Sequence, residues 1–215
     1  MSELQPPTTI TLRAPSKYLS NPSEPPTETP FSAPPLPWLR RTWTVTHSTL
    51  SMWRSAQNVR ITYKPYKDPS SATNDNLVEY EKSNGKGGVK SVEGIEKPDK
   101  SIPAAWNWRG KGLLAIASSH WEVLGWGERP LPTTGDGEGN EAEGGKTERW
   151  AVTWFAPTLF TQEGVDIYSD LKEGLSKETA DEIIKALKEL KDAPKVVELV
   201  EKHIQEVAIS LPWKQ

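Results

Sequence analysis

Residues 41–49, Arg-Thr-Trp-Thr-Val-Thr-His-Ser-Thr, decide the fold of this 215-residue chain. Their side chains alternate in character, with Trp43, Val45 and His47 on one face and threonines on the other. A period of two is that of a β-strand with one buried and one solvated face. We therefore predict a strand here whose face bearing Trp43, Val45 and His47 points into a core.

Further stretches of the same kind follow at short intervals. We predict strands at residues 58–64, 77–82, 89–95, 106–110, 113–118, 121–127, 149–156 and 165–168. Eight or nine consecutive strands with short links favour an antiparallel meander that closes into a barrel, because closure removes the exposed edges of the sheet. A barrel of eight strands is just wide enough to hold one small ligand. The predicted fold class is mainly β, an up-and-down barrel of eight to nine strands with C-terminal helices.

Three parts of the chain differ in composition. Residues 1–37 hold ten of the 19 prolines and few apolar side chains, so we expect a disordered, proline-rich arm. Residues 38–170 carry the predicted barrel. Residues 171–215 change to helical spacing, and we expect two amphipathic helices packed on the barrel. The segment 34–37 has the minimal spacing of a proline-rich ligand, which leaves a partner for the arm as a minor alternative.

Charge and composition exclude several classes of function. With 26 basic and 29 acidic side chains, the chain lacks the basic excess that is typical of nucleic-acid-binding proteins. It holds no cysteine, which excludes disulfides, thiol catalysis and cysteine-bound metal. No apolar run reaches membrane-spanning length, so we expect no membrane insertion and a cytoplasmic location. We also expect no metal and no cofactor, because nothing in the spacing of the three histidines requires one.

Several features resemble the lipocalin-like barrels of the calycin superfamily. Trp43 opens the first strand just after the proline-rich lead, Trp53 lies in the following turn, and helices come after the strands. The chain departs from the family pattern in having Arg41 where a glycine stands two residues before the tryptophan, and two helices where one is usual. It is also similar to small fungal proteins of calycin type in the runs 109–112 and 118–122. The resemblance implies a barrel that binds small hydrophobic molecules, with enzymes as a minority.

Tryptophan is the strongest deviation in composition, with 10 residues against three phenylalanines. Flat, rigid indole rings suit the lining of a pocket for an aromatic or lipid-like ligand. The predicted ligand-binding residues are His47, Trp43, Tyr63, Tyr80, Trp106, Trp108, Arg109, His120, Trp121, Trp150 and Trp154. Two alternatives stay open. The rings fill the barrel and leave no cavity, or Arg109 covers a tryptophan face instead of receiving a carboxylate.

His47 and Glu122 are the candidate catalytic residues. An inward histidine on the first strand would bond a ligand, act as an acid or base, or be a core histidine satisfied by a neighbour. No nucleophile, base and orienting group can be recognised together, so whether the chain is an enzyme is left open. The predicted function is binding of a small hydrophobic ligand inside the barrel. The alternatives are a lipocalin-fold enzyme of isomerase or cyclase type acting on an apolar metabolite, and an interaction protein with a filled barrel.

Overall fold

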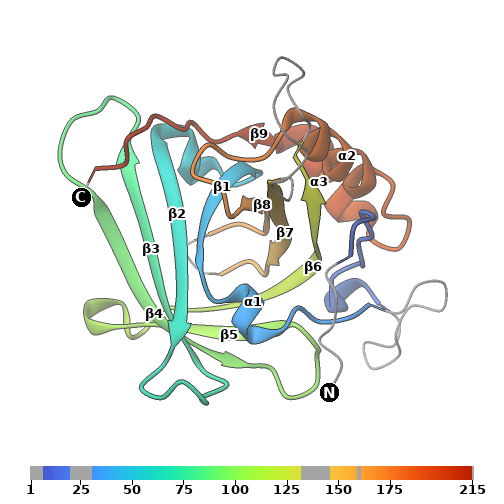
Figure 1. Ribbon diagram of the computed structural model, residues 1–215. Coiled ribbons are helices and arrows are strands. Elements are labelled where there is room, and N and C mark those ends of the chain that lie inside the picture. Colours follow the sequence, from blue (N-terminus) through green and yellow to red (C-terminus); the bar gives the residue numbers. More distant parts are fainter. Residues whose placement is uncertain (1–6, 20–30, 132–145, 159–160, 215) are drawn as a thin grey trace.

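Eight strands close into an antiparallel barrel in the computed structural model of the chain (Figure 1). The structure describes residues 7–19, 31–131, 146–158 and 161–214. Within these residues one sheet has the order β2-β3-β4-β5-β6-β7-β8-β1-β9, and an additional pairing of β1 with β2 closes the barrel. The strands are β1 (Thr42–Ser48), β2 (Ala56–Pro65), β3 (Asn74–Lys82), β4 (Lys90–Pro98), β5 (Ala105–Gly110), β6 (Ser118–Pro130), β7 (Thr147–Phe155), β8 (Gly164–Ser169) and β9 (Gln205–Glu206). Apart from the closing β8–β1 pair, barrel neighbours are consecutive along the chain, so the predicted up-and-down barrel is confirmed.

The link between β5 and β6 differs from the prediction of a strand at residues 113–118. A short 3-10 helix, η3 (Gly112–Leu114), and a loop stand there instead. Gly112 has a φ of 56°, a left-handed conformation that ends the extended backbone of β5. The apolar run after it lacks polar–apolar alternation, and Leu113 and Ile116 are 100% and 84% exposed. The run is therefore an apolar surface loop and not a strand.

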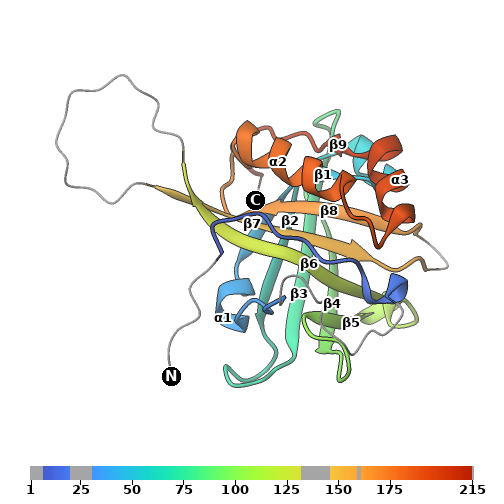
Figure 2. The same ribbon diagram turned by 90° about the vertical axis from the view of Figure 1, so that its right-hand side faces the viewer.

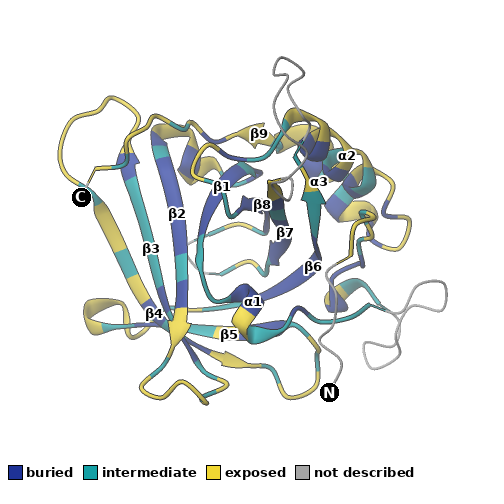
Figure 3. Ribbon diagram, in the orientation of Figure 1, coloured by how far each residue is buried: buried dark blue, intermediate teal, exposed yellow. Residues whose placement is uncertain are grey.

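The barrel wall carries apolar side chains on both faces in its β6–β8 half. Trp43, Val45 and Val123 belong to the cluster that faces the interior. Trp150 and Ile167 belong to a second cluster, which faces the helices outside. Strands β7 and β8 are consequently buried along most of their length, whereas β3 and β4 keep intermediate or exposed positions (Figure 3).

The helices α2 (Lys177–Lys188) and α3 (Pro194–His203) form a layer over β7 and β8 (Figure 2). Ser176 caps α2 by accepting a hydrogen bond from the backbone N–H of Thr179. The apolar faces of both helices pack in the outer cluster, with Ile183 and Val200 fully buried. No helix in the described ranges is long and apolar enough to cross a membrane.

The chain beyond α3 is extended, so the last part of the range 171–215 is not helical. Strand β9 pairs with β1, and the backbone N–H of Asn58 on β2 donates to the carbonyl of Ala208. The Asn58 side chain then exchanges two hydrogen bonds with the Ser210 backbone, of 2.7 and 2.8 Å. The last described residues therefore run across the outside of β1 and β2 towards β3 (Figure 1).

The N-terminal segment 7–19 packs along the outside of β6, so the expectation of a disordered arm is wrong for these residues (Figure 2). The backbone N–H of Arg13 donates to the carbonyl of Leu124, and the N–H of Glu128 donates to the carbonyl of Pro7. A Cβ on Gly125 would lie 2.6 Å from the Thr11 carbonyl oxygen, so the glycine permits this close approach. The low apolar content of the segment did not predict this packing, because backbone and polar contacts hold much of the segment in place.

Residues 31–37 also belong to the fold. Phe31 packs against the interior cluster, Pro34 is buried, and helix α1 (Leu36–Leu39) follows directly. The segment 34–37 is thus part of a packed turn and not the free, extended ligand that the proline spacing indicated. Residues 1–6 and 20–30 of the expected arm lie outside the described residues.

Candidate functional site

A cavity of about 390 Å³ lies inside the barrel, at the end near η3 and the 3-10 helix η2 (Ser51–Ser55). Inward side chains of several strands form its walls, among them Ile61, Val78, Val92 and Phe155. Partly or fully exposed apolar side chains ring its mouth: Met52, Leu113, Leu114 and Ile116. The cavity therefore opens to solvent through an apolar rim.

The other end of the barrel is filled. Trp38 of α1 packs against Trp43 and Trp126, with ring centroids 5.1 and 4.7 Å apart. The indole N–H of Trp43 donates to the Leu39 carbonyl at 2.8 Å, which fixes the ring. The tryptophans thus fill one end of the barrel and line a pocket at the other, so both interpretations left open by the sequence apply.

Aromatic rings form one wall of the cavity. Trp121 is stacked between Tyr63 and Trp106, at centroid distances of 5.6 and 4.5 Å. Trp108 lies over Gly94 of the neighbouring strand, where a Cβ would come within 2.0 Å of its Nε1 atom. That Nε1–H donates to Asn76 Oδ1 at 3.2 Å. These contacts hold the rings in fixed orientations, as a binding surface for a flat or aliphatic ligand requires.

Glu96 is a buried acid that lines the same cavity, with 2% of its surface exposed. Its Oε1 atom accepts a hydrogen bond from Trp121 Nε1 at 3.1 Å. Its Oε2 atom has no hydrogen-bond partner in the described structure. Burial raises the pKa of Glu96 well above its usual range, against the smaller opposing effects of Trp121 and Asn74.

Asp166 on β8 is a second buried acid in the cavity wall. The Ser48 hydroxyl donates to its Oδ1 atom at 2.5 Å. Burial raises the pKa of Asp166 to about 7, although the hydrogen bond from Ser48 favours the charged form. The cavity thus combines apolar walls with two carboxyl groups whose ionisation burial opposes.

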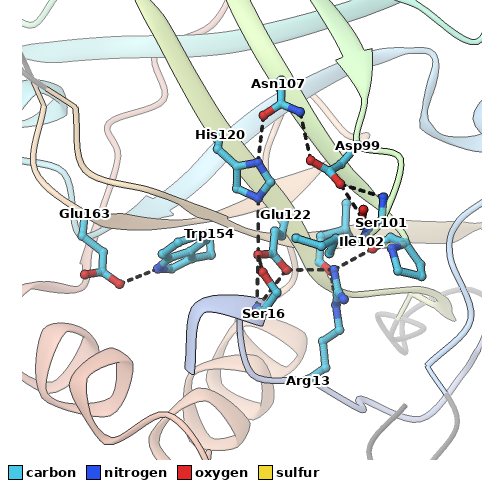
Figure 4. Close-up of polar contacts among 12 residues, drawn as sticks. Arg13, Ser16, Asp99, Ser101, Ile102, Asn107, His120, Glu122, Trp154 and Glu163 are labelled. Atoms are coloured by element: carbon cyan, nitrogen blue, oxygen red, sulfur yellow. Dashed lines mark hydrogen bonds and ion pairs between the residues drawn. The ribbon is translucent and has the colours of Figure 1, made fainter. Parts of the chain in front are cut away.

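A separate polar cluster, the outer clasp of Arg13, Ser16, His120 and Glu122, lies on the outer face of the barrel (Figure 4). Glu122 accepts hydrogen bonds from the Ser16 backbone and hydroxyl and pairs with Arg13 at 3.1 Å. His120 Nε2 lies 3.4 Å from Glu122 Oε1, while its Nδ1 lies 3.1 Å from Asn107 Oδ1. The clasp fastens the N-terminal segment to β6 and is not part of the cavity.

His47 faces away from the cavity, so the prediction that it points into the barrel with Trp43 and Val45 is wrong. A β-bulge between Val45 and His47 shifts the register of β1 against β8. Beyond it His47 pairs with Ile167, a residue of the outer cluster, while Ser48 pairs with the cavity residue Asp166. Burial lowers the pKa of His47, against the raising effects of Glu206 and Asp181, which lie outside the barrel. The extra residue of the bulge turned the histidine outwards.

The other predicted ligand-binding residues fall into two groups, those that face the interior of the barrel and those that face its outside. Three of the eleven line the cavity: Tyr63, Trp108 and Trp121. Trp43 fills the closed end, Trp106 lies behind Trp121, and Tyr80 packs on Trp53. The remaining ones lie outside the barrel interior: Arg109, His120, Trp150 and Trp154, together with the catalytic candidate Glu122. Placing these residues in the pocket was wrong. Trp150 and Trp154 belong to the outer apolar cluster, whereas Arg109, His120 and Glu122 make polar contacts outside the barrel.

Several cavity residues were missed from the sequence. Val92, Gly94 and Glu96 share one face of β4 by simple alternation, so Glu96 could have been found as an inward acid. Asp166 alternates with Tyr168 in the same way on β8. Among the described residues no group of three or more histidine, aspartate or glutamate side chains is placed to hold a metal ion.

No family model and no curated protein sequence matches the chain. Solved structures that resemble it include apocrustacyanin C1, at 10% identity and a TM-score of 0.46, over 80% of this chain and 78% of that one. Apocrustacyanin C2 has 9% identity and the same TM-score over 80% and 77%. The siderocalin Ex-FABP has 10% identity and a TM-score of 0.46 over 81% and 95%. The fold described above rests on strand order and pairing and not on these likenesses.

Proposed function

We propose that this protein binds one small apolar ligand inside its barrel. The observation that carries the proposal is the cavity of about 390 Å³, which is walled by apolar and aromatic side chains. This volume lies within the range of small-molecule sites in proteins, roughly 300–1,000 Å³. One end of the barrel is closed by packed tryptophans, so a ligand enters at the other.

The rim of the cavity supports this direction of entry. Leu113, Ile116 and Met52 are exposed together beside the mouth, although exposure of large apolar side chains is unfavourable. Contiguous exposed apolar residues mark binding grooves and interaction sites. A ligand seated in the cavity would cover part of this surface and gain hydrophobic free energy of about 25 cal/mol per Å².

A second function, catalysis on an apolar metabolite, is favoured by the two buried acids. Carboxyl groups with raised pKa values in apolar cavities are suited to general acid and base chemistry at neutral pH. Glu96 and Asp166 take the place that His47 and Glu122 had as acid–base candidates. Binding remains the primary proposal, because a cavity is sufficient for binding whereas a reaction needs a substrate placed against these groups.

The binding proposal is tested with N-phenyl-1-naphthylamine, a neutral apolar probe whose fluorescence rises in apolar surroundings. We expect saturable binding with a stoichiometry near one and quenching of tryptophan emission. Trp108→Ala removes a cavity wall and should weaken binding by about tenfold, a loss of roughly 1.4 kcal/mol. Lys97→Ala, a change at an exposed residue of β4 that is not among the lining residues of the cavity, is the control and should leave the affinity unchanged. Non-saturating fluorescence, or equal effects of both variants, would contradict the proposal.

Two further parts of the proposal, a similarity to small fungal proteins of calycin type and a cytoplasmic location, rest on the sequence. The similarity is supported by the runs 109–112 and 118–122. The location is tested by fractionation of cells that produce the protein.

A further inference from the structure

The described ionisable side chains that line the cavity include acids but no basic group. The cavity's described lining residues include Glu96 and Asp166 but no lysine, arginine or histidine. An anionic ligand such as a fatty acid would therefore meet carboxyl groups and no cation to balance its own charge. Bringing a further carboxylate into an apolar site beside these two groups is unfavourable both by desolvation and by repulsion.

Glu96 Oε2 is an unpaired and solvent-inaccessible atom of a residue that lines this cavity. The residue is 98% buried, its Oε1 atom is held by Trp121, and Oε2 makes no hydrogen bond in the described structure. A buried polar atom without a partner costs about 1–3 kcal/mol. Because Glu96 lines the cavity, a donor on a ligand can supply this missing partner once the carboxyl group turns towards it.

We propose that the ligand is an apolar amine and that its N–H group pairs with Glu96 Oε2, a proposal that rests on the binding function proposed above. The amine is defined by its chemistry: one basic nitrogen on an aliphatic or aromatic body small enough for the cavity. Asp166 on β8, across the barrel from β4, adds a second acid to the cavity and strengthens the preference for a cation.

A neighbouring ring also favours a cation. Trp121 is covered on both faces by Tyr63 and Trp106, but Trp108 pairs with Glu96 in the sheet and lines the cavity beside it. An indole face attracts an ammonium group, by about 0.5–2 kcal/mol depending on how far the cation is desolvated. The ion pair with Glu96 and the ring of Trp108 together offset the desolvation of the ammonium group.

Asn74 offers the alternative partner for Glu96. Its side chain lies close enough to favour the charged form of Glu96, yet Asn74 Nδ2 makes no hydrogen bond in the described structure. If Asn74 were the true partner, Glu96 would be a structural acid and its replacement would not affect ligand choice. The experiment below separates these roles.

Pairing of Glu96 with an amine is coupled to release of a proton, because burial raises the pKa of this carboxyl in the empty site well above its usual range and so favours its protonated form. The ligand arrives as an ammonium ion, the carboxyl proton leaves to solvent, and an ammonium–carboxylate pair remains. Affinity should therefore rise with pH until the pKa of Glu96 in the empty site is passed. The other titratable groups around this part of the barrel are Tyr63 on β2 and Asp166 and Tyr168 on β8.

The test compares decylamine, decan-1-ol and decanoate, which share one chain and differ in the head group. Their affinities are measured by displacement of N-phenyl-1-naphthylamine, and proton release is measured by calorimetry in buffers of different ionisation enthalpy. We expect decylamine to bind about tenfold more tightly than decan-1-ol, decanoate to bind most weakly, and the amine to release a proton.

Glu96→Gln should abolish the preference for decylamine over decan-1-ol and the proton release. The matched control is Glu93→Gln on the same strand, whose exposed side chain pairs with Lys111 outside the cavity. Equal affinity for amine and alcohol, tightest binding of decanoate, or an unchanged preference in Glu96→Gln would each overturn the amine proposal while leaving a binding cavity. If none of the three molecules displaced a saturably bound probe, the amine proposal would fall and the binding function would stand; if the probe itself did not bind saturably, both would fall.

Discussion

Two buried glutamates on opposite faces of the barrel wall differ in what surrounds them. Glu122 in the outer clasp is fully buried and contacts Arg13, Ser16 and His120 (Figure 4). Glu96 in the cavity is as deeply buried, and its hydrogen bond from Trp121 leaves Oε2 unpaired. Burial alone disfavours a carboxylate, so the partners decide whether the acid is ionised.

The consequences for the two acids are opposite. At Glu122 burial acts to raise the pKa, but the hydrogen bonds from His120 and Ser16 and the charge of Arg13 hold it below its usual value. At Glu96 burial prevails and raises the pKa. A satisfied buried acid stabilises the fold, whereas an unsatisfied one in a cavity is kept at a cost to stability, which a ligand can offset.

The largest expected effect is on the outer clasp. Glu122→Gln removes the charge opposite Arg13 and turns an amide N–H₂ towards donors, so we expect a loss of about 3 kcal/mol in the free energy of unfolding near neutral pH. The contribution of Glu122 is present above the pKa of an unfolded glutamate, about 4.3, and is lost as pH falls through its lower folded pKa. Urea unfolding followed by circular dichroism measures it, and a loss below about 1 kcal/mol would contradict the account of the clasp.

Glu96→Gln should raise the free energy of unfolding, whereas Glu122→Gln should lower it. The folded protein keeps the Glu96 proton at pH values where the unfolded chain has released it, so this group lowers stability as pH rises above about 4.3, by about 1.4 kcal/mol per pH unit. The decrease continues until the raised folded pKa is reached. The variant lacks this effect, so its free energy of unfolding should rise relative to that of the parent protein as pH increases above about 5, until the folded pKa of Glu96 is passed.

Urea unfolding at several pH values measures this difference, with Glu93→Gln as the control on the same strand. Asp166 titrates in both the parent and the variant, so its contribution cancels in the comparison. A difference between Glu96→Gln and the parent that does not change with pH would show that Glu96 is ionised in the fold, and the contrast with Glu122 would disappear.

The barrel could be predicted from the sequence because its signal is periodic. Alternation in residues 41–49 and in the later runs marks strands, and the change to helical spacing marks α2 and α3. These signals depend on which residues are apolar and need no knowledge of contacts between distant parts of the chain. They therefore predict elements and their order.

The site could be predicted only in part, because two β-bulges and an outer layer change which residues face inwards. The bulge between Val45 and His47 reverses parity on β1, and the register shift between Val123 and Gly125 lets Trp121 and Trp126 both face the interior of the barrel. A bulge is set by pairing with a neighbouring strand, which local alternation does not reveal. The clasp was missed for a related reason, since its members lie about a hundred residues apart in the chain.

The smallest expected effects on affinity and stability are those of a change at His47. Whether this side chain lies inside or outside the barrel decides which residues of β1 face the cavity. The bulge places it with Ile167 on the outer face, facing Glu206 and Asp181. His47→Phe should therefore leave the affinities for N-phenyl-1-naphthylamine and decylamine within about twofold and change stability by less than about 1 kcal/mol. Burial lowers the folded pKa of His47, so below about pH 6.5 the unfolded chain binds the proton more readily and the histidine costs stability. The variant should accordingly gain on the parent as pH falls from about 7 to 5. If the affinity for either molecule fell by more than about fivefold in a folded variant, His47 would belong to the cavity, and the inward assignments of Ser48 and Asp166 on the paired strands would be wrong with it.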